Sequence, residues 1–235
     1  MNGQFLEIAQ DPRVVPGVHR YCDEWCGYCP VTTRCLVFRC EELLRAERGR
    51  KKEEGTFATM EEAIEFTRQI SAIEGTRTDE LDELLAHPPG ESGVRTEDPL
   101  ADRALEYAVR TELALLPVAL RLGSRRPSQP PAVPSAAEVV MWYHARIYTK
   151  IFRALVSAAS DCAAGPRGED ARGCAKLAMV SIERSRLALQ VLRRTTRPDL
   201  IDPLIALLSD LDRDLEERFP EARGFVRVGL DCPIA

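Results

Sequence analysis

The chain of 235 residues is 45% hydrophobic, 29% charged and 6% aromatic, and its formal net charge is −5. These values are ordinary for a folded globular protein and exclude a largely disordered chain, while the scarcity of aromatic residues favours helices over sheets. The negative charge excludes a general attraction to nucleic acid, and no apolar run approaches the roughly 20 residues that span a bilayer.

Helix-start and helix-stop signals alternate along the chain. Thr59 with Glu62, and Ser135 with Glu138, form capping-box patterns at two helix starts. Pro117 is expected to kink or interrupt its helix, because proline lacks the backbone N–H that a helix needs. The expected helices are, in chain order, one that follows the first cysteines and ends near residue 48, then 59–74, 79–85, 98–122, 135–163, 174–195 and 200–218.

These elements predict an all-α protein, a helical bundle of four or more long helices with an N-terminal cysteine-rich metal-binding module. No stretch alternates apolar and polar residues for long enough to require a sheet. We assign residues 1–55 to the cysteine-rich module, which leads into a helix, and residues 56–235 to the helical bundle. A proline-rich linker is expected near 123–134, and a further loop over 166–173.

Five of the eight cysteines fall within residues 22–40, with the spacing Cys22-x3-Cys26-x2-Cys29-x5-Cys35-x4-Cys40. The opening residues contain acids and lack the apolar segment of a secretory signal, so we expect a cytoplasmic protein, where clustered cysteines are metal ligands or redox groups rather than disulfides. Four soft thiolates this close can converge on one soft metal centre, which offsets their mutual repulsion. The residues predicted to bind the metal or cofactor are Cys22, Cys26, Cys29 and Cys35.

The other cysteines are expected to lie outside this site. Cys40 is five positions past Cys35, so in a helix it points to a different face and is interpreted as a core residue. The remaining three are scattered along the chain, at Cys162, Cys174 and Cys232. His19 is near enough along the chain to replace a cysteine as a ligand, and an ordinary surface histidine is the alternative interpretation.

The spacing leaves the identity of the metal open between two classes. Structural zinc usually takes two pairs of cysteines separated by a longer arm, whereas compact cysteine runs next to a proline are more typical of iron–sulfur clusters. We therefore expect a [4Fe-4S] cluster, with zinc as the alternative. Free or catalytic thiols are a third interpretation of the same pattern.

The segment from Cys26 to Leu36, CGYCPVTTRCL, resembles the CxxCPVxxxCL stretch of WhiB-like proteins over about a dozen residues. The resemblance implies that Cys26, Cys29 and Cys35 supply three of the four thiolates of a [4Fe-4S] cluster. A broader pattern resembles uncharacterised bacterial helical proteins that begin with a YCDxWCxxCPxxxRC-like segment and continue with a WY…K…RAL segment. Here the second segment is Trp142-Tyr143, Lys150 and Arg153-Ala154-Leu155. That resemblance implies an intact module and brings no assigned activity.

The helical scaffold carries no recognised catalytic motif. None of the three histidines follows a glutamate by three residues, which excludes a ferritin-like di-iron site, and no P-loop, GxGxxG or GxSxG motif is present. Helical spacing places His144 in an apolar stripe, so we predict that it is buried, with Lys150 on a neighbouring side of the same helix. The stripe consists of Met141, His144, Tyr148, Ile151 and Leu155. A hydrogen-bonded core histidine and a lysine that reaches for water are the alternative to a polar pocket.

The sequence thus favours a metal-binding protein with a [4Fe-4S] cluster for redox sensing or electron transfer. We expect a protein or redox partner, and neither nucleic acid nor a membrane; the oligomeric state is left open. The alternative is a zinc-stapled module for protein interaction. A further alternative is an enzyme with a site between the cluster and the bundle around His144 and Lys150, and no catalytic residue is predicted.

Overall fold

The computed structural model describes residues 3–49, 56–75, 98–123, 134–159, 166–195 and 197–232, and the predicted helix at 79–85 and linker at 124–133 lie outside them. The described residues form helices and connections without a strand, which confirms the all-α class for this part of the chain. Within it, no helix has both the length and the apolar composition that crossing a membrane requires.

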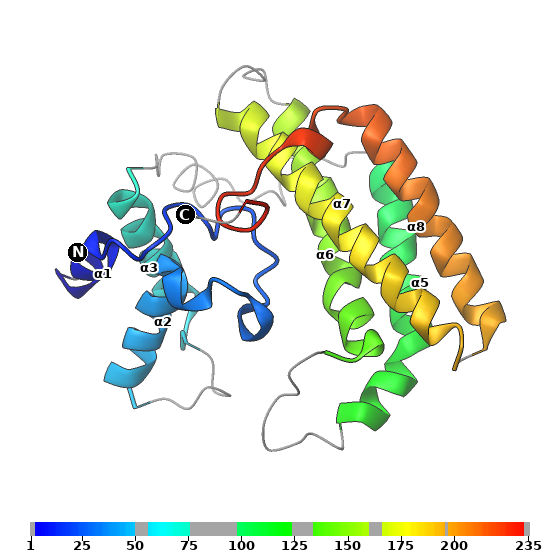
Figure 1. The fold of residues 1–235 in the computed structure, drawn as a ribbon, viewed down its shortest axis with the longest axis horizontal. Coiled ribbons are helices and arrows are strands. Elements are labelled where there is room, and N and C mark those ends of the chain that lie inside the picture. Colours follow the sequence, from blue (N-terminus) through cyan, green and yellow to red (C-terminus); the bar gives the residue numbers. More distant parts are fainter. Residues whose placement is uncertain are drawn as a thin grey trace. The chain divides into compact units, whose positions relative to one another are not determined.

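The chain divides into two compact units (Figure 1). We call Met1–Val94 with Val226–Ala235 the cysteine unit, and Arg95–Phe225 the four-helix unit. This division differs from the sequence-based boundary at residue 55, because the helix after that boundary packs with the cysteine-rich segment. The two units are described separately below.

The cysteine unit contains three α-helices, α1 (Gly3–Gln10), α2 (Leu36–Glu47) and α3 (Met60–Ile73). One hydrophobic core joins all three helices, and its buried members are Phe5, Leu36, Cys40, Phe66 and Ile70. Apolar side chains spaced three to five residues apart on α2 and α3 therefore meet Phe5 of α1, and their burial holds the unit together.

Local sequence signals set the ends of α2 and α3 as expected. Gly49, with φ of 60°, follows the last residues of α2 in the left-handed conformation that ends many helices. The Thr59 hydroxyl accepts a hydrogen bond from Glu62 N at 3.3 Å, which confirms the predicted helix start. The Glu62 carboxylate in turn accepts from Ala58 N at 2.8 Å and from Arg48 at 2.7 Å, so the cap also ties α3 to the end of α2.

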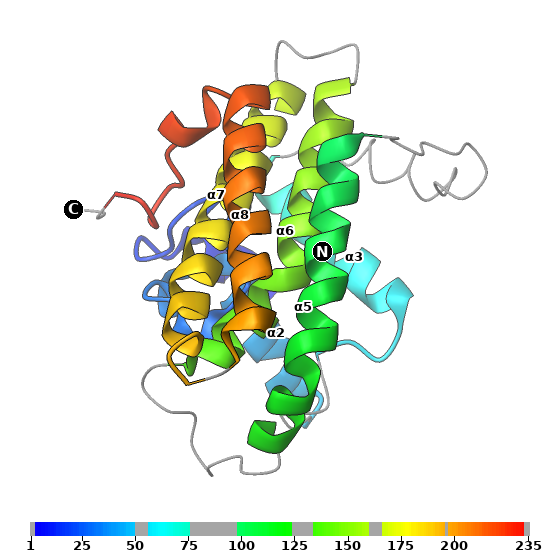
Figure 2. The same ribbon diagram turned by 90° about the vertical axis from the view of Figure 1, so that its right-hand side faces the viewer.

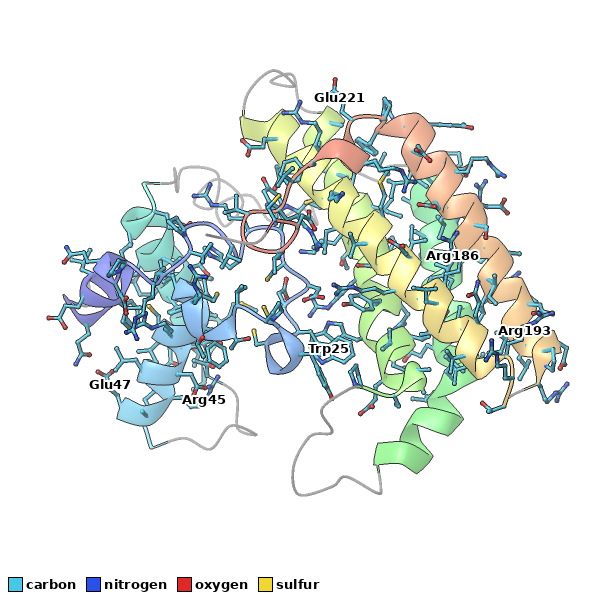
Figure 3. The ribbon with its side chains drawn as sticks, in the orientation of Figure 1. Trp25, Arg45, Glu47, Arg186, Arg193 and Glu221 are labelled. Carbon is cyan, nitrogen blue, oxygen red and sulfur yellow. The ribbon has the colours of Figure 1, made fainter. Side chains whose placement is uncertain are left out.

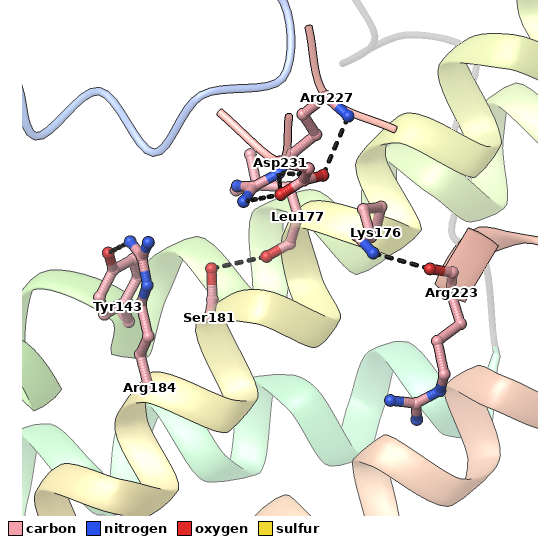
Figure 4. A network of polar contacts seen from close by, with 8 residues as sticks. All are labelled: Tyr143, Lys176, Leu177, Ser181, Arg184, Arg223, Arg227 and Asp231. Atoms are coloured by element: carbon pink, nitrogen blue, oxygen red, sulfur yellow. Dashed lines mark hydrogen bonds and ion pairs between the residues drawn. The ribbon is translucent and has the colours of Figure 1, made fainter. Parts of the chain in front are cut away.

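The C-terminal tail belongs to the cysteine unit. Arg227 is buried and clamps Asp231, with its Nη2 2.6 Å from Asp231 Oδ1 and its backbone N donating to Asp231 Oδ2 at 2.9 Å (Figure 4). The clamp closes a turn that presents Leu230 to a small apolar cluster containing Val15 and Cys35. The tail is therefore part of the packing beneath the cysteine-rich segment.

The four-helix unit consists of α5 (Pro99–Gly123), α6 (Ala136–Ala159), α7 (Pro166–Leu192) and α8 (Pro198–Arg218). Helix α6 packs against α5 and α7, and α8 packs against the same two, so the four lie side by side (Figure 2). The reciprocal capping box at the start of α6 is confirmed, since Ser135 N donates to Glu138 at 2.7 Å and Glu138 N to the Ser135 hydroxyl at 3.3 Å. Helix α5 continues past Pro117, which therefore does not end it.

The predicted loop at 166–173 is wrong, because these residues form the first two turns of α7. Pro166 occupies the first helical position, where its missing N–H is not needed. Asp170 is then held against α6 by Arg153 at 2.8 Å and by the Ser157 hydroxyl at 2.7 Å. These contacts across two helices outweigh the glycines that suggested a break.

The predicted buried stripe of α6 is confirmed at Ile151 and Leu155, whereas nearer the start of the helix the buried side is shifted by one residue. Its buried residues are Ala137, Val140, Tyr143, Ile147, Ile151, Ala154 and Leu155. His144 is partly buried beside these residues, and its Nδ1 lies 2.8 Å from the Met141 carbonyl oxygen of the same helix. Tyr143 takes the central place because Arg184 donates to its hydroxyl at 2.5 Å (Figure 4), which satisfies the polar end of a buried ring.

This helix phase is tested by a matched pair of truncations. Ile147→Ala should lower the free energy of unfolding by about 3 kcal/mol, because it leaves a cavity at a fully buried position. Met141→Ala, at a partly buried position, should cost only about 1 kcal/mol. Chemical denaturation followed by circular dichroism measures both values. If Met141→Ala lowered the free energy of unfolding more than Ile147→Ala, the buried side of the helix would instead be the one that carries Met141 and His144.

Candidate metal centre

The predicted ligands lie on one connection between α1 and α2, which we call the cysteine loop (residues 19–35). Two short 3-10 turns, Cys26–Tyr28 and Thr32–Arg34, shape it. The Thr32 hydroxyl lies 2.6 Å from the Cys26 carbonyl oxygen and 2.9 Å from that of Cys29, within hydrogen-bond distance of both. The Thr32 side chain thus links the Cys-x-x-Cys turn to the turn that leads to Cys35.

Cys35 is the residue that caps α2, with an extended backbone at φ −89° and ψ 123°. The loop is anchored here, since Val15 N donates to the Arg34 carbonyl at 2.9 Å and Cys35 packs with Val15 and Val18. Burial raises the pKa of the Cys35 thiol, while the amides of Phe38 and Val37 lower it. These amides belong to the positive end of the helix, where a thiolate is favoured.

All four predicted ligands line one small pocket that is partly open to solvent. Cys26 is exposed, Cys22 and Cys29 are partly buried, and Cys35 is buried. We call the part of the pocket at Cys26 its open side and the part at Cys35 its closed side. Apolar and aromatic walls come from Val18, Val31 and Trp25. The Trp25 ring (Figure 3) packs edge-on against Tyr28, with ring centres 4.8 Å apart.

Two thiols of this pocket resist ionisation. Burial is the main cause that raises the pKa of Cys22 to about 12 and that of Cys26 to about 11, and negative charge on Cys35 and Asp23 contributes to both values. These two thiols are therefore neutral at physiological pH, and a bound cation has to displace their protons.

In the described part of the chain, no three His, Cys, Asp or Glu side chains are grouped closely enough to hold a metal ion. The four cysteines therefore share a pocket without standing in a coordination shell. Their convergence on one metal stays a prediction, and binding would require the loop to draw its sulfurs inward. The donor set favours a soft metal, because four thiols line the pocket, against the two carboxylates of Asp23 and Glu24 and the imidazole of His19.

The other cysteines are placed apart from the pocket lining. Cys40 is buried between α1, α2 and α3, as expected for a core residue, and burial raises its pKa to about 12. Cys174 is buried on α7 of the four-helix unit, with its sulfur 3.9 Å from Asp170 Oδ1. Cys232 is exposed on the C-terminal tail, and Cys162 lies outside the described residues.

His19 lines the same pocket, and it has a partner that sequence reasoning missed. Its Nε2 lies 3.6 Å from Oε2 of Glu74, the residue that ends α3. Glu74 also accepts from Gly17 N at 3.3 Å and from Arg20 Nη2 at 3.1 Å. The spacing of the cysteines pointed to His19, but no local signal could have pointed to a glutamate 55 positions away.

His144 and Lys150 are the residues of the enzyme alternative, and their described contacts do not place them in one site. The Nδ1 atom of His144 is engaged by its own helix, and Lys150 lies six positions further on, about 240° around the helix axis. Burial raises the pKa of Cys174 to about 11, and the positive charge of Lys150 acts on the same thiol in the opposite direction. These contacts fit a structural role for both residues in α6.

Comparison with protein-family models, with curated proteins and with solved structures found no match to this chain. The local likeness to WhiB-like proteins thus rests on the residues of the cysteine loop alone.

The metal-free cysteine unit should lose stability above pH 9. The pKa values of Cys22 and Cys26 in the fold, about 12 and about 11, exceed the ordinary value of 9.0. Because the folded-state values are raised, the stability from neutral thiols is complete below the ordinary pKa and is lost as the pH rises through the folded values. Denaturant unfolding reported by Trp25 fluorescence, in a Trp142→Phe background, measures the loss. The free energy of unfolding of Cys22→Ser should fall less above pH 9 than that of the parent protein. Equal decreases would contradict the assignment of this effect to the Cys22 thiol.

Proposed function

We propose that the cysteine loop binds a metal centre through Cys22, Cys26, Cys29 and Cys35, and that this centre is a [4Fe-4S] cluster used for redox sensing or electron transfer. The observation that carries the proposal is that these four side chains, from a stretch of 14 residues, all line one pocket. Thiolate sulfur is the protein ligand of such clusters, and a short loop closes around a metal at small entropic cost.

The surroundings of the pocket suit a redox centre. The Val18, Val31 and Trp25 side chains exclude water from part of the lining, and a low-dielectric wall tunes the potential of an iron–sulfur site. The amides of Phe38 and Val37 stabilise negative charge on the Cys35 sulfur. A bound cluster supplies one-electron chemistry there, and the residues of the loop hold it and control how much water reaches it.

Sensing is favoured by the graded exposure of the ligands. Cys26 lies at the open side, so small oxidants reach a centre held by the loop from that side. Cys35 is both a proposed ligand and the cap of α2, so a metal bound to Cys35 would tie the rest of the loop to the start of a helix. The same bonds that hold the metal thus couple its presence to the order of the loop, which a protein partner can recognise.

Zinc is the second candidate, and one observation favours it. His19 stands in the pocket with Glu74 behind it, and zinc accepts imidazole nitrogen as readily as thiolate. With zinc the centre would be a structural staple, and the cysteine unit would be a module for protein interaction. The thiol ligands would be the same, but the redox role would be absent.

Metal analysis separates the two candidates. Protein purified without oxygen should contain about four iron and four sulfide per chain, with a visible absorption that a reductant bleaches. If the same material contained zinc and no sulfide, the redox role would be excluded, whereas the metal site itself would be supported. A preparation free of both metals, which also fails to take up either, would remove the proposal.

Replacing Cys29 by Ser should strip the metal and loosen residues 20–40, because the loop loses a ligand and the bonds that order it. The four-helix unit should keep its helices, since its core contains none of these residues. Metal content, hydrogen exchange over residues 20–40 and far-ultraviolet circular dichroism measure the three effects. Cys232→Ser is the matched control and should leave metal content unchanged. Full metal content in Cys29→Ser would contradict the ligand assignment.

A further inference from the structure

One ring nitrogen of His19 is buried and unused. Among the described residues no hydrogen-bond partner meets His19 Nδ1, although the atom is shielded from solvent. A buried polar atom without a partner costs free energy, so such atoms point to a water, an ion or a ligand. Because His19 lines the pocket of the four thiols, a metal bound in that pocket is a candidate for the missing partner.

The Glu74 carboxylate determines which tautomer His19 adopts. Its Oε2 lies 3.6 Å from His19 Nε2, and a negative oxygen favours a proton on the nitrogen that faces it. In the neutral ring the proton then sits on Nε2, and Nδ1 presents a lone pair. Burial lowers the pKa of His19, which favours this neutral form over the cation. A carboxylate that holds one imidazole nitrogen while the other faces a metal is the usual support of a histidine ligand.

Glu74 is itself fixed in place. Its side chain is 10% exposed, and it accepts from Gly17 N and from Arg20 Nε and Nη2 at 3.1–3.3 Å. Three donors from Gly17 and Arg20 therefore fix one carboxylate at the end of α3. This carboxylate faces His19 Nε2 from a position that does not depend on a metal.

Cys22 is the thiol that lies nearest to His19 along the loop. The two are joined by a turn in which Cys22 N donates to the His19 carbonyl at 3.5 Å. The carboxylates of Asp23 and Glu24 line the same pocket next to Cys22. A neutral imidazole ligand would not add to their negative charge, whereas a thiolate would.

We propose that His19, through Nδ1, is an alternative fourth ligand of the metal centre and exchanges with Cys22. This inference rests on the proposed function, since it requires that Cys26, Cys29 and Cys35 bind a metal. The centre then has two ligand sets, four thiolates or three thiolates with one imidazole, which differ by one unit of charge. Replacing thiolate by imidazole raises the potential of an iron–sulfur centre, so the exchange would tune its redox behaviour.

The test uses Co²⁺ alone, added to the metal-free full chain without oxygen. The sulfur-to-cobalt charge-transfer intensity scales with the number of bound thiolates, and the ligand-field bands distinguish four sulfurs from three sulfurs with one nitrogen. Cys22→Ser should still bind Co²⁺, with about a quarter less charge-transfer intensity and the bands of a nitrogen ligand. The double variant Cys22→Ser/His19→Ala should lose tight binding.

Two further variants separate ligation from general damage. Cys22→Ser/His144→Ala is the matched control, because it removes a histidine of the four-helix unit, and it should bind like Cys22→Ser. Glu74→Gln in the Cys22→Ser background should weaken Co²⁺ binding about 10- to 100-fold, since the imidazole loses its support. Glu74→Gln in the parent chain, where Cys22 is intact, should weaken Co²⁺ binding less.

Each outcome has a distinct meaning. A Cys22→Ser protein that binds no Co²⁺ while the parent binds it would overturn the exchange and leave the four-thiolate proposal standing. Equal binding by Cys22→Ser with and without His19 would also overturn the exchange. A parent chain that takes up no Co²⁺ would overturn the proposed function together with this inference.

Discussion

The cost of holding several thiolates together in a partly buried pocket is the constraint on which the candidate site depends. Burial and neighbouring negative charge keep Cys22 and Cys26 protonated at physiological pH, and the same surroundings would make four thiolates unstable without a cation. A bound metal removes this conflict, because its charge replaces the protons that the thiols release. The loop can therefore exist in a metal-free form, in which Cys22 and Cys26 are protonated, and in a metal-bound form, and it need not be ordered in the same way in both.

The rest of the cysteine unit limits how far the loop can move. Cys35 is held at the start of α2 by the Val15 cluster, and the tail adds Leu230 to the same packing. On the other side, Glu74 holds the loop through Gly17 and Arg20. The closed side of the pocket is thus rigidly supported while Cys26 stays exposed. This asymmetry allows the fold to hold a metal from one side and leave the other accessible to oxidants or a partner.

Features that depend on residues three or four apart were predictable from the sequence. The caps at Thr59 and Ser135, and the stop at Gly49, involve neighbours along the chain and appear in the fold as expected. The start of α7 was not predictable in this way, because the contact between Asp170 and Arg153 crosses two helices. Local signals at glycines suggested a loop there, and tertiary packing outweighed them.

The sequence by itself determined the all-α class and the candidate ligands, since the spacing of the cysteines brings their sulfurs to one short loop whatever the rest of the chain does. Only the tertiary structure decided which face of α6 is buried, because Tyr143 can enter the core only where Arg184 meets its hydroxyl. It also decided the surroundings of His19, which Glu74 reaches from the far end of another helix. Spacing along a chain specifies donors that lie close in sequence, whereas the groups that orient them come from wherever folding places them.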